Sequence, residues 1–387
     1  MKNSKLLSLQ GCTIFLFLIL TNACKVDTVA TAPDPVFKKD SDVTAAINDM
    51  YAALARIGNY NGGIFGAQEL GSDELMEPQR GTDWYDGNQY IHAQTHQNVS
   101  TDLYLNYAWT ECYGPIATAN LLINHLPTYS ASQAATLLPE VRAVRAYFYF
   151  QILDIFGNAP IFINNPAGTD EFISKDRTTV YAFVESELKT VLPNLSKTKT
   201  YGKMNYWSAQ ALLSRLYLNA EIYTGKSNFP AAQAAADDVI KNSPYKLENN
   251  YYTNFISANE NSNENIWVVP YDGVNLKGFT APISSLDPIE KASTFNLQNQ
   301  PWNGYCAIQE FYNSYDKTDA RAKNFLVGQR YAVNGTTKID VNYTPEVNEL
   351  YPSARHDAGA RIGKFELKPS TDGNLSNDFP IFRLAEM

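Results

Sequence analysis

Two short stretches of this chain combine aromatic rings with side chains that pair with hydroxyl groups. A flat ring covers the C–H face of a pyranose, while amide, carboxylate and guanidinium groups pair with the sugar hydroxyls. The alternative, that a ring simply packs onto the scaffold, stays open for both tryptophans. The candidate ligand-binding residues are Asp73, Arg80, Trp84, Tyr85, Asn88 and Tyr90 in the first stretch and Trp302, Asn303 and Tyr305 in the second.

The sequence contains no evident catalytic or metal-binding motif. A glycoside hydrolase needs two carboxyl groups roughly 5–10 Å apart, and the adjacent Asp73 and Glu74 form no evident pair. His92 and His96 fall at i, i+4, but neither HExxH nor a third ligand accompanies them, which favours surface histidines. No GxSxG, P-loop or dinucleotide-binding motif appears. We therefore expect a non-enzyme without cofactor or metal, and a surface glycoside hydrolase stays as an alternative.

The charge balance argues against partners that carry many phosphates. Forty acidic side chains outnumber thirty-one basic ones, which gives a formal net charge of -9. Such a chain lacks the cationic surface that tracks a polyanion. We expect no nucleic-acid partner.

The first residues are typical of a secreted lipoprotein. Lys2 and Lys5 precede an apolar run at 12–20 that is too short to span a membrane. Cleavage before Cys24 in L-T-N-A-C would expose a thiol for lipidation, and a plain signal peptide is the alternative. Residues 1–23 are thus a predicted signal peptide and 24–40 a lipidated tether. Of the other cysteines, Cys112 and Cys306 remain in the mature chain, and their wide separation favours two buried thiols over a disulfide.

The elements that must position the candidate residues are mostly helices. Apolar spacing predicts helices over 41–57, 100–126, 137–156, 179–192, 206–223 and 229–241, while 58–97 is expected to be one long loop. A weak internal sequence repeat at an offset of 68 residues, twice a tetratricopeptide period, favours helix pairs. It matches Ala143, Tyr149, Phe150 and Gly157 with Ala211, Tyr217, Leu218 and Gly225.

After about residue 245 the pattern changes to short β-prone runs between segments rich in Asn, Ser, Gly and Pro. One such run is I-W-V-V-P-Y at 266–271. The last residues, F-P-I-F-R-L-A-E-M, are expected to enter a further helix. Because a two-turn helix without a cap or partner is marginal, we expect the chain to stop before its final helices.

Several strings, in this order, resemble landmarks of the SusD/RagB family of outer-membrane lipoproteins. They are N-D-M-Y-A-A-L, E-V-R-A-V-R-A-Y-F-Y-F-Q-I-L-D-I-F-G-N-A-P-I-F, S-A-Q-A-L-L-S-R-L-Y-L-N-A-E-I-Y-T-G, A-D-D-V-I-K, P-Y-K-L, N-E-N-I-W-V-V-P-Y and F-P-I-F-R-L-A-E-M. Each string alone is only an amphipathic segment, so the resemblance depends on their joint order across the chain.

The resemblance implies a mainly α fold, in which tetratricopeptide-like helix pairs form a scaffold with long ligand-binding loops and few short strands. Residues 41–250 would form the helical region and 251–387 a truncated loop-rich region. It also implies a surface-exposed lipoprotein of the outer membrane that binds a glycan and partners a SusC-like TonB-dependent transporter. Family ligand residues come from the region that matches 73–90. A ligand of another kind, a peptide or other nutrient, stays as the alternative.

Overall fold

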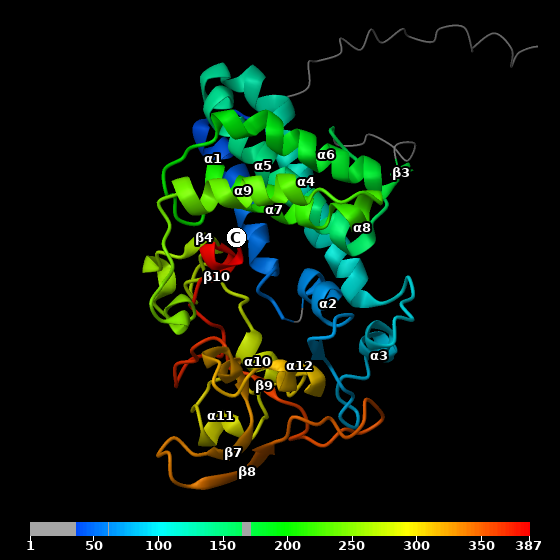
Figure 1. Ribbon diagram of the computed structural model, residues 1–387, viewed down its shortest axis with the longest axis vertical. Helices are drawn as coiled ribbons and strands as arrows, with labels where there is room; N and C mark the ends of the chain where they lie inside the picture. Colours follow the sequence, from blue (N-terminus) through cyan, green and yellow to red (C-terminus); the bar gives the residue numbers. More distant parts are fainter. Residues whose placement is uncertain (1–35, 61, 165–171) are drawn as a thin grey trace, which may run out of the picture. The chain divides into compact units, whose positions relative to one another are not determined.

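The computed structural model describes residues 36–60, 62–164 and 172–387, and those from Phe37 onward form one unit. The predicted signal peptide, Cys24 and most of the predicted tether lie outside the described residues. Helices that pack in pairs dominate the first part of this unit, with α4 against α5, α5 against α6, and α7 against α9 (Figure 1). They are α1 (Asp40–Ala52), α4 (Leu103–Tyr129), α5 (Ala131–Phe156), α6 (Arg177–Val191), α7 (Tyr206–Leu218), α8 (Ala220–Thr224) and α9 (Phe229–Asn242).

Capping residues explain where these helices begin and end. The Ser130 hydroxyl accepts a hydrogen bond from the Gln133 amide at the start of α5, and Asp176 does the same for Thr179 at the start of α6. At the end of α5, Gly157 takes a positive φ of 70°, which an L side chain would strain. The bounds agree with the predicted ranges to within a few residues, except that α5 begins six residues earlier than predicted.

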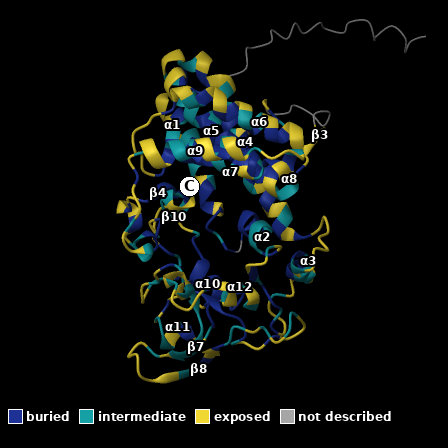
Figure 2. Cartoon of the chain, viewed as in Figure 1, coloured by how far each residue is buried: buried dark blue, intermediate teal, exposed yellow. Residues whose placement is uncertain are grey.

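The hydrophobic core lies where these helices meet (Figure 2). The second half of α5 is buried almost all round, from Val141 to Leu153, because neighbouring helices cover it on several sides. The rings of Tyr147 and Phe148 in α5 are fully buried. The expected mainly α scaffold is therefore confirmed.

The expectation of one long loop over 58–97 is wrong, because this stretch contains two short helices, α2 (Gly63–Glu69) and α3 (Gln89–Gln94). Helix α2 packs against α4 so closely that a Cβ at Gly63 would collide with the backbone nitrogen of Ala108. Glycine-rich sequence here therefore marks a close approach of two backbones, not a loop. The segment between α2 and α3 is irregular and carries the first candidate stretch.

The second part of the chain consists of short elements joined by long connections. Its helices are α10 (Ala281–Ser285), α11 (Glu290–Ser293) and α12 (Gln309–Ser314). Five antiparallel strand pairs occur among the described residues, β1 with β5, β2 with β3, β4 with β10, β6 with β9, and β7 with β8. The strands are β1 (Leu75–Met76), β2 (Ala159–Pro160), β3 (Ser174–Lys175), β4 (Asn265–Val269), β5 (Cys306–Ala307), β6 (Phe325–Leu326), β7 (Gly328–Tyr331), β8 (Lys338–Tyr343), β9 (Arg361–Ile362) and β10 (Phe379–Arg383).

The predicted helix at 379–387 is wrong for most of its length. The segment forms β10, in which Phe379 pairs with Val269 of β4, and only a single 3-10 turn follows at Leu384–Glu386. Phe382 is completely buried and lies under the guanidinium group of Arg215. This contact with distant residues decides the conformation, which a local helical pattern could not reveal.

Two further properties of the described chain bear on its setting. Cys112 and Cys306 are both buried free thiols, as predicted. Within the described ranges, no helix combines the length and the apolar character that a membrane span requires.

Candidate functional site

The two candidate stretches, more than two hundred residues apart in sequence, meet in the structure. The indole Nε1 of Trp84 donates a hydrogen bond of 2.8 Å to the backbone oxygen of Trp302. The Trp84 ring is half-buried against the core, whereas the Trp302 side chain keeps 39% of its surface exposed. The two alternatives for Trp84 were contact with a ligand and packing onto the scaffold. Its position is compatible with both, because it packs on the scaffold and still lines an open hollow.

This hollow has a volume of about 820 Å³ and will be called the two-tryptophan hollow. It combines ring faces, hydroxyls, amides and carboxylates, which is the set of groups that the sequence predicted for sugar recognition. Its lining residues are Thr82, Asp83, Trp84, Asp86, Thr280, Ile283, Pro288, Asn299, Gln300, Pro301, Trp302 and Asn374.

Helix α10 holds the second stretch in place. The amide nitrogens of Trp302 and Gly304 donate to the carbonyl oxygens of Ile283 and Ser284 in α10, at 2.7 and 2.8 Å. Gly304 also permits close packing, because a Cβ there would collide with a carboxylate oxygen of Glu77. The backbone of this stretch is thus fixed independently of the Trp302 ring.

Left-handed backbone conformations shape both stretches. Trp84 has a φ of 62°, Asp86 of 33° and Asn88 of 69°, and Asn303 has a φ of 55° in the second stretch. Such values are rare for bulky residues and persist only where surrounding contacts enforce them. Here they turn the Trp84 ring toward the Trp302 backbone.

Arg80 and Asn303 fasten the two stretches together and do not face the hollow. Arg80 is buried, and its guanidinium group donates to the backbone oxygens of Asn303 at 2.8 Å, Ala358 at 2.9 Å and Arg355. Burial and the nearby Arg361 lower the pKa of Arg80 to about 10, so that it stays cationic at neutral pH. We reassign Arg80 and Asn303 from ligand contact to support.

Tyr90 and Tyr305 are supports as well. Tyr305 is 2% exposed, and its ring packs edge-on against Phe65 with the centroids 5.4 Å apart. Tyr90 is buried edge-on under Trp84, and its hydroxyl donates to the Asp86 carboxylate at 3.0 Å. Both rings set the position of the walls and are closed to a ligand.

Three other predicted residues, Asp73, Tyr85 and Asn88, do not line the hollow. Tyr85 follows Trp84 directly and is 49% exposed, so its ring stands beside the first wall. Asp73 is exposed in the turn before β1.

Sequence reasoning missed most of the polar lining. Asp83 and Asp86 flank Trp84, and Asn299 and Gln300 precede Trp302. Their closeness in sequence to a candidate tryptophan is the signal that could have identified them. Asn374 carried no such signal, since only the fold brings it to the hollow.

Glu77 lies beneath the hollow as a buried carboxyl group. It is 1% exposed, and neither of its oxygens has a hydrogen-bond partner among the described residues. Burial raises the pKa of Glu77 well above its ordinary range, the charge of Asp86 raises it further, and Arg80 opposes both. Burial thus favours the protonated, uncharged form of Glu77.

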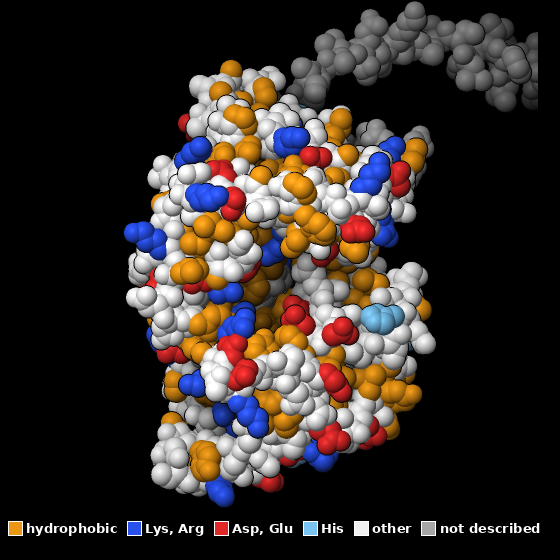
Figure 3. All heavy atoms as spheres, in the orientation of Figure 1, with side chains coloured by type: hydrophobic (Ala, Val, Ile, Leu, Met, Phe, Trp, Pro, Cys, Tyr) orange, Lys and Arg blue, Asp and Glu red, His pale blue; other side chains and the backbone are white. Residues whose placement is uncertain are grey.

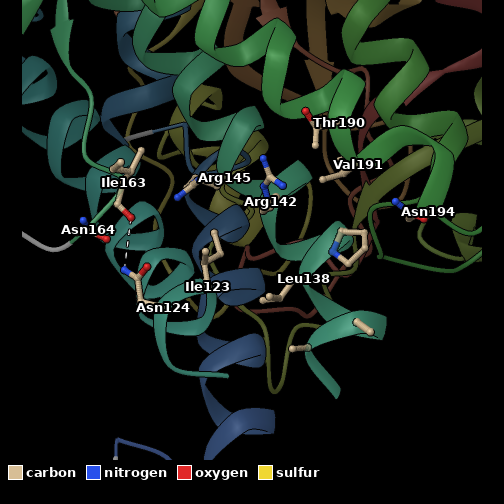
Figure 4. Close-up of a pocket in the computed structure, with 13 residues that line it drawn as sticks. Ile123, Asn124, Leu138, Arg142, Arg145, Ile163, Asn164, Thr190, Val191 and Asn194 are labelled. Carbon is tan, nitrogen blue, oxygen red and sulfur yellow. Dashed lines mark hydrogen bonds between the residues drawn. The ribbon is translucent and has the colours of Figure 1, made fainter. Parts of the chain in front are cut away.

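Another hollow, between α4, α5 and the end of α6, differs in chemistry (Figure 4). Its described lining consists of aliphatic, amide, hydroxyl and guanidinium groups without an aromatic ring. The two arginines there, Arg142 and Arg145, are both paired with Glu187 at 2.5 Å. This hollow offers no stacking surface, so the two-tryptophan hollow is the better candidate for sugar recognition.

The described residues include no cluster of three His, Cys, Asp or Glu side chains that could hold a metal ion. His92, one of the two histidines spaced at i, i+4, contacts the Asp102 carboxylate at 2.9 Å. That carboxylate also accepts the amide of Val99, which makes the contact part of a turn.

The helix pairs form a scaffold, and the loops on this scaffold form a ring-lined hollow. The class of this protein is therefore a helical scaffold that carries a candidate ligand site built from loops. A family model described as "Starch-binding associating with outer membrane" matches residues 31–218. A SusD-like protein of Bacteroides ovatus is 26% identical over 322 residues, which are 74% of this chain and 59% of the relative. The starch-binding protein SusD of Bacteroides thetaiotaomicron is 33% identical over 146 residues, 36% of this chain and 26% of the relative.

Solved structures share the fold. A laminarin-binding SusD-like protein superposes with a TM-score of 0.69 at 21% identity, over 90% of this chain and 79% of the other. Surface glycan-binding protein A of Bacteroides thetaiotaomicron, solved with laminarihexaose, gives 0.69 at 17% identity, over 90% and 77%. In sequence and in fold, the chain is similar to SusD-like proteins. It spans about half the length of the first two curated relatives, 59% and 52%.

Proposed function

We propose that this protein binds an oligosaccharide or polysaccharide in the two-tryptophan hollow and passes it to a SusC-like TonB-dependent transporter. The observation that carries the proposal is the meeting of Trp84 and Trp302 over one open hollow. Solved proteins of the same fold carry laminarin, laminarihexaose or a xylogluco-oligosaccharide in their descriptions, which supports a glycan as the ligand.

The expected affinity is modest. If each ring and sugar face together bury about 100 Å² of apolar surface, each platform contributes on the order of 2 kcal/mol. Two platforms with a few hydroxyl contacts then give dissociation constants of roughly millimolar to micromolar. Weak binding suits a protein that must release its ligand to a transporter.

The family description associates such proteins with the outer membrane. We propose that lipidated Cys24 anchors the chain on the cell surface, where it meets both the glycan and the transporter. The ring-lined hollow lies in the unit that follows the proposed tether, which leaves it available to an extracellular polymer.

We further propose that the protein binds its ligand without cleaving it. Asp83 and Asp86 line the hollow as exposed side chains, whereas a general acid must stay protonated next to the scissile oxygen. The nearby carboxyl group with a raised pKa is that of Glu77, which lies sealed beneath Trp84 and Gly304. It has no path to a glycosidic bond.

The test is affinity electrophoresis of the purified chain in gels that contain plant, host or microbial polysaccharides. We expect retardation by at least one polymer, and at least a tenfold loss of affinity in Trp84→Ala and in Trp302→Ala. Tyr107→Ala is the matched control, because this ring is 50% exposed on α4 and does not line the hollow.

Each outcome has a clear meaning. Retained binding in both tryptophan variants would contradict the site, and release of reducing sugar would contradict the non-enzyme assignment. Retardation by no polysaccharide, together with binding of a peptide mixture, would favour the alternative nutrient ligand.

A further inference from the structure

The charged groups at the two-tryptophan hollow are of one sign. Two lining residues are acidic, Asp83 and Asp86, and both are exposed. The other polar lining consists of hydroxyl and amide side chains, and the described lining includes no Lys, Arg or His. The net charge of the whole chain does not predict this, because thirty-one basic residues are available elsewhere.

The acceptor groups of the hollow are open to a ligand. Asp83 and Gln300 make no side-chain hydrogen bond within the described part of the chain, and Asp86 uses one carboxylate oxygen for Tyr90. Carboxylates accept hydrogen bonds from hydroxyls, and such charge-assisted bonds are stronger than neutral ones. A polyhydroxylated, uncharged ligand therefore finds strong acceptors here.

The nearest cations cannot offset the two carboxylates by turning into the hollow. Arg80 donates from its guanidinium group to three backbone carbonyls. Arg361 donates to one of these, that of Ala358, to two others and to the Asn303 side chain. Both are buried, so releasing either would leave buried carbonyls unpaired. Lys277, near the Asn374 side of the hollow, is paired with Asp372 at 3.4 Å.

Elsewhere, acidic and basic side chains are interspersed on the face drawn in Figure 3, without a continuous cationic track. An anionic polymer would thus gain no guidance toward the hollow from this face and would meet repulsion inside it. Placing like charges together in a site is a common way to reject a wrong ligand.

We propose that the two-tryptophan hollow selects an uncharged glycan and that Asp83 and Asp86 reject polymers bearing carboxylate or sulfate groups. The inference rests on the proposed glycan-binding function and adds the charge class of the ligand. The Trp84 and Trp302 rings supply affinity for any pyranose, whereas the two carboxylates supply the discrimination.

The test first compares neutral with anionic polymers and then compares one neutral polymer with a charged derivative that has the same backbone. Gels at low ionic strength contain laminarin, amylopectin or xyloglucan in one arm, and alginate, polygalacturonate or chondroitin sulfate in the other. The neutral polymer that retards the chain is then compared by calorimetry with its own carboxymethyl derivative. We expect the derivative to bind at least tenfold more weakly, and the difference to shrink in 0.5 M NaCl, where charges are screened.

The variant Asp83→Asn/Asp86→Asn separates repulsion from a steric clash of the carboxymethyl groups. It keeps the side-chain size and removes both charges, so we expect it to recover most of the affinity for the derivative. Its affinity for the neutral polymer should fall a few-fold, because amide acceptors are weaker. Asp237→Asn on α9 is the control, with no recovery expected.

The possible failures are distinguishable. Strong binding of an anionic polymer that is lost in Trp84→Ala would overturn the charge inference and still support the proposed function. A derivative that stays weak in the double variant and in high salt would also overturn it, because sterics would then explain the difference. Binding of no polysaccharide would defeat the proposed function itself, and the inference with it.

Discussion

The helical region, from α1 to α9, and the loop-rich region that follows it each contain a buried acid, and the surroundings of these two acids differ. In the helical region, Glu187 is buried between α5 and α6 and is paired with Arg142 and Arg145 at 2.5 Å. In the loop-rich region, Asp378 is 2% exposed, and one of its oxygens has no hydrogen-bond partner in the described chain. Glu187 is thus paired with two cations from the facing helix, whereas Asp378 has no ion pair among the described residues. Other acids of the loop-rich region are paired, as Glu290 is with Arg330.

This difference shows what holds each region together. The helical region depends on apolar stripes and helix caps, which are contacts between residues close in sequence or on facing helices. In the loop-rich region, buried polar side chains donate to backbone carbonyls, as Arg361 does to His356. Arg80, from the loop before α3, reaches the carbonyl of Asn303 in this region. The candidate site is built in this second way. Loops held by polar contacts can leave an aromatic ring exposed, whereas packed helices would bury it.

The largest effect on stability is expected for Arg361→Ala. Arg361 is completely buried and donates to the backbone oxygens of His356, Ala358 and Gly359 and to the Asn303 side chain. Removing it takes this buried donor from the oxygens of His356 and Gly359 and from the Asn303 side chain, so we expect the free energy of unfolding to fall by about 3–5 kcal/mol. Chemical denaturation measures this loss. Glycan affinity should fall as well, because Asn303 adjoins Trp302.

The matched change in the helical region is Asn205→Ala. The Asn205 side chain caps α7 by accepting from the amides of Trp207 and Ser208. Loss of such a cap costs about 1 kcal/mol, and glycan affinity should not change. Equal losses in the two variants would contradict the view that buried polar side chains matter more in the loop-rich region.

The two buried acids Asp378 and Glu187 should respond oppositely to pH. Burial raises the pKa of Asp378 to about 7, against an opposing hydrogen bond from Tyr201. Because the folded state then binds the proton more tightly than the unfolded chain, this contribution to stability is lost as the pH rises from about 4 to 7. Burial alone would also raise the pKa of Glu187, but Arg142 and Arg145 outweigh it and lower this pKa. The Glu187 contribution is lost as the pH falls below about 4.5.

Thermal melts between pH 3 and 8 test this contrast. Asp378→Asn mimics the protonated acid, and we expect it to remove a decline on the order of 2 kcal/mol between pH 4 and 7. Glu187→Gln should instead lose stability above pH 5 and change little in acid. Asp340→Asn is the control, since this side chain is exposed. A profile for Asp378→Asn that keeps the decline of the parent chain would contradict the assignment.

Most of the helical region could be predicted because its signals are local. The apolar spacing of α5 and the glycine at its end lie within one window of sequence, and both recur in the structure. The predictions for 58–97 and 379–387 were wrong because those conformations depend on contacts between residues far apart in sequence. Gly63 suits α2 only because the α4 backbone lies against it, and Phe382 is in a strand only because β4 and Arg215 receive it.

The candidate site could be predicted in its residue types but not in their roles. Trp84 and Trp302 were found because rings beside amides are unusual in loops, and the fold places both at one hollow. Arg80 and Asn303 have equally suitable chemistry and yet are buried. No local pattern distinguishes a guanidinium group that faces a ligand from one that donates to carbonyls more than two hundred residues away.

The smallest effect on stability is expected at the ring proposed to contribute most directly to binding. In Trp302→Ala the backbone contacts to Ile283 and to the Trp84 indole remain, so the free energy of unfolding should change by less than about 0.5 kcal/mol. Trp84→Ala removes that indole hydrogen bond and about half a buried ring, which should cost about 2 kcal/mol. Denaturation curves of both variants, measured beside their glycan affinities, decide the point. Equal destabilisation would mean that Trp302 is a structural ring like Tyr305 and would remove it from the binding surface.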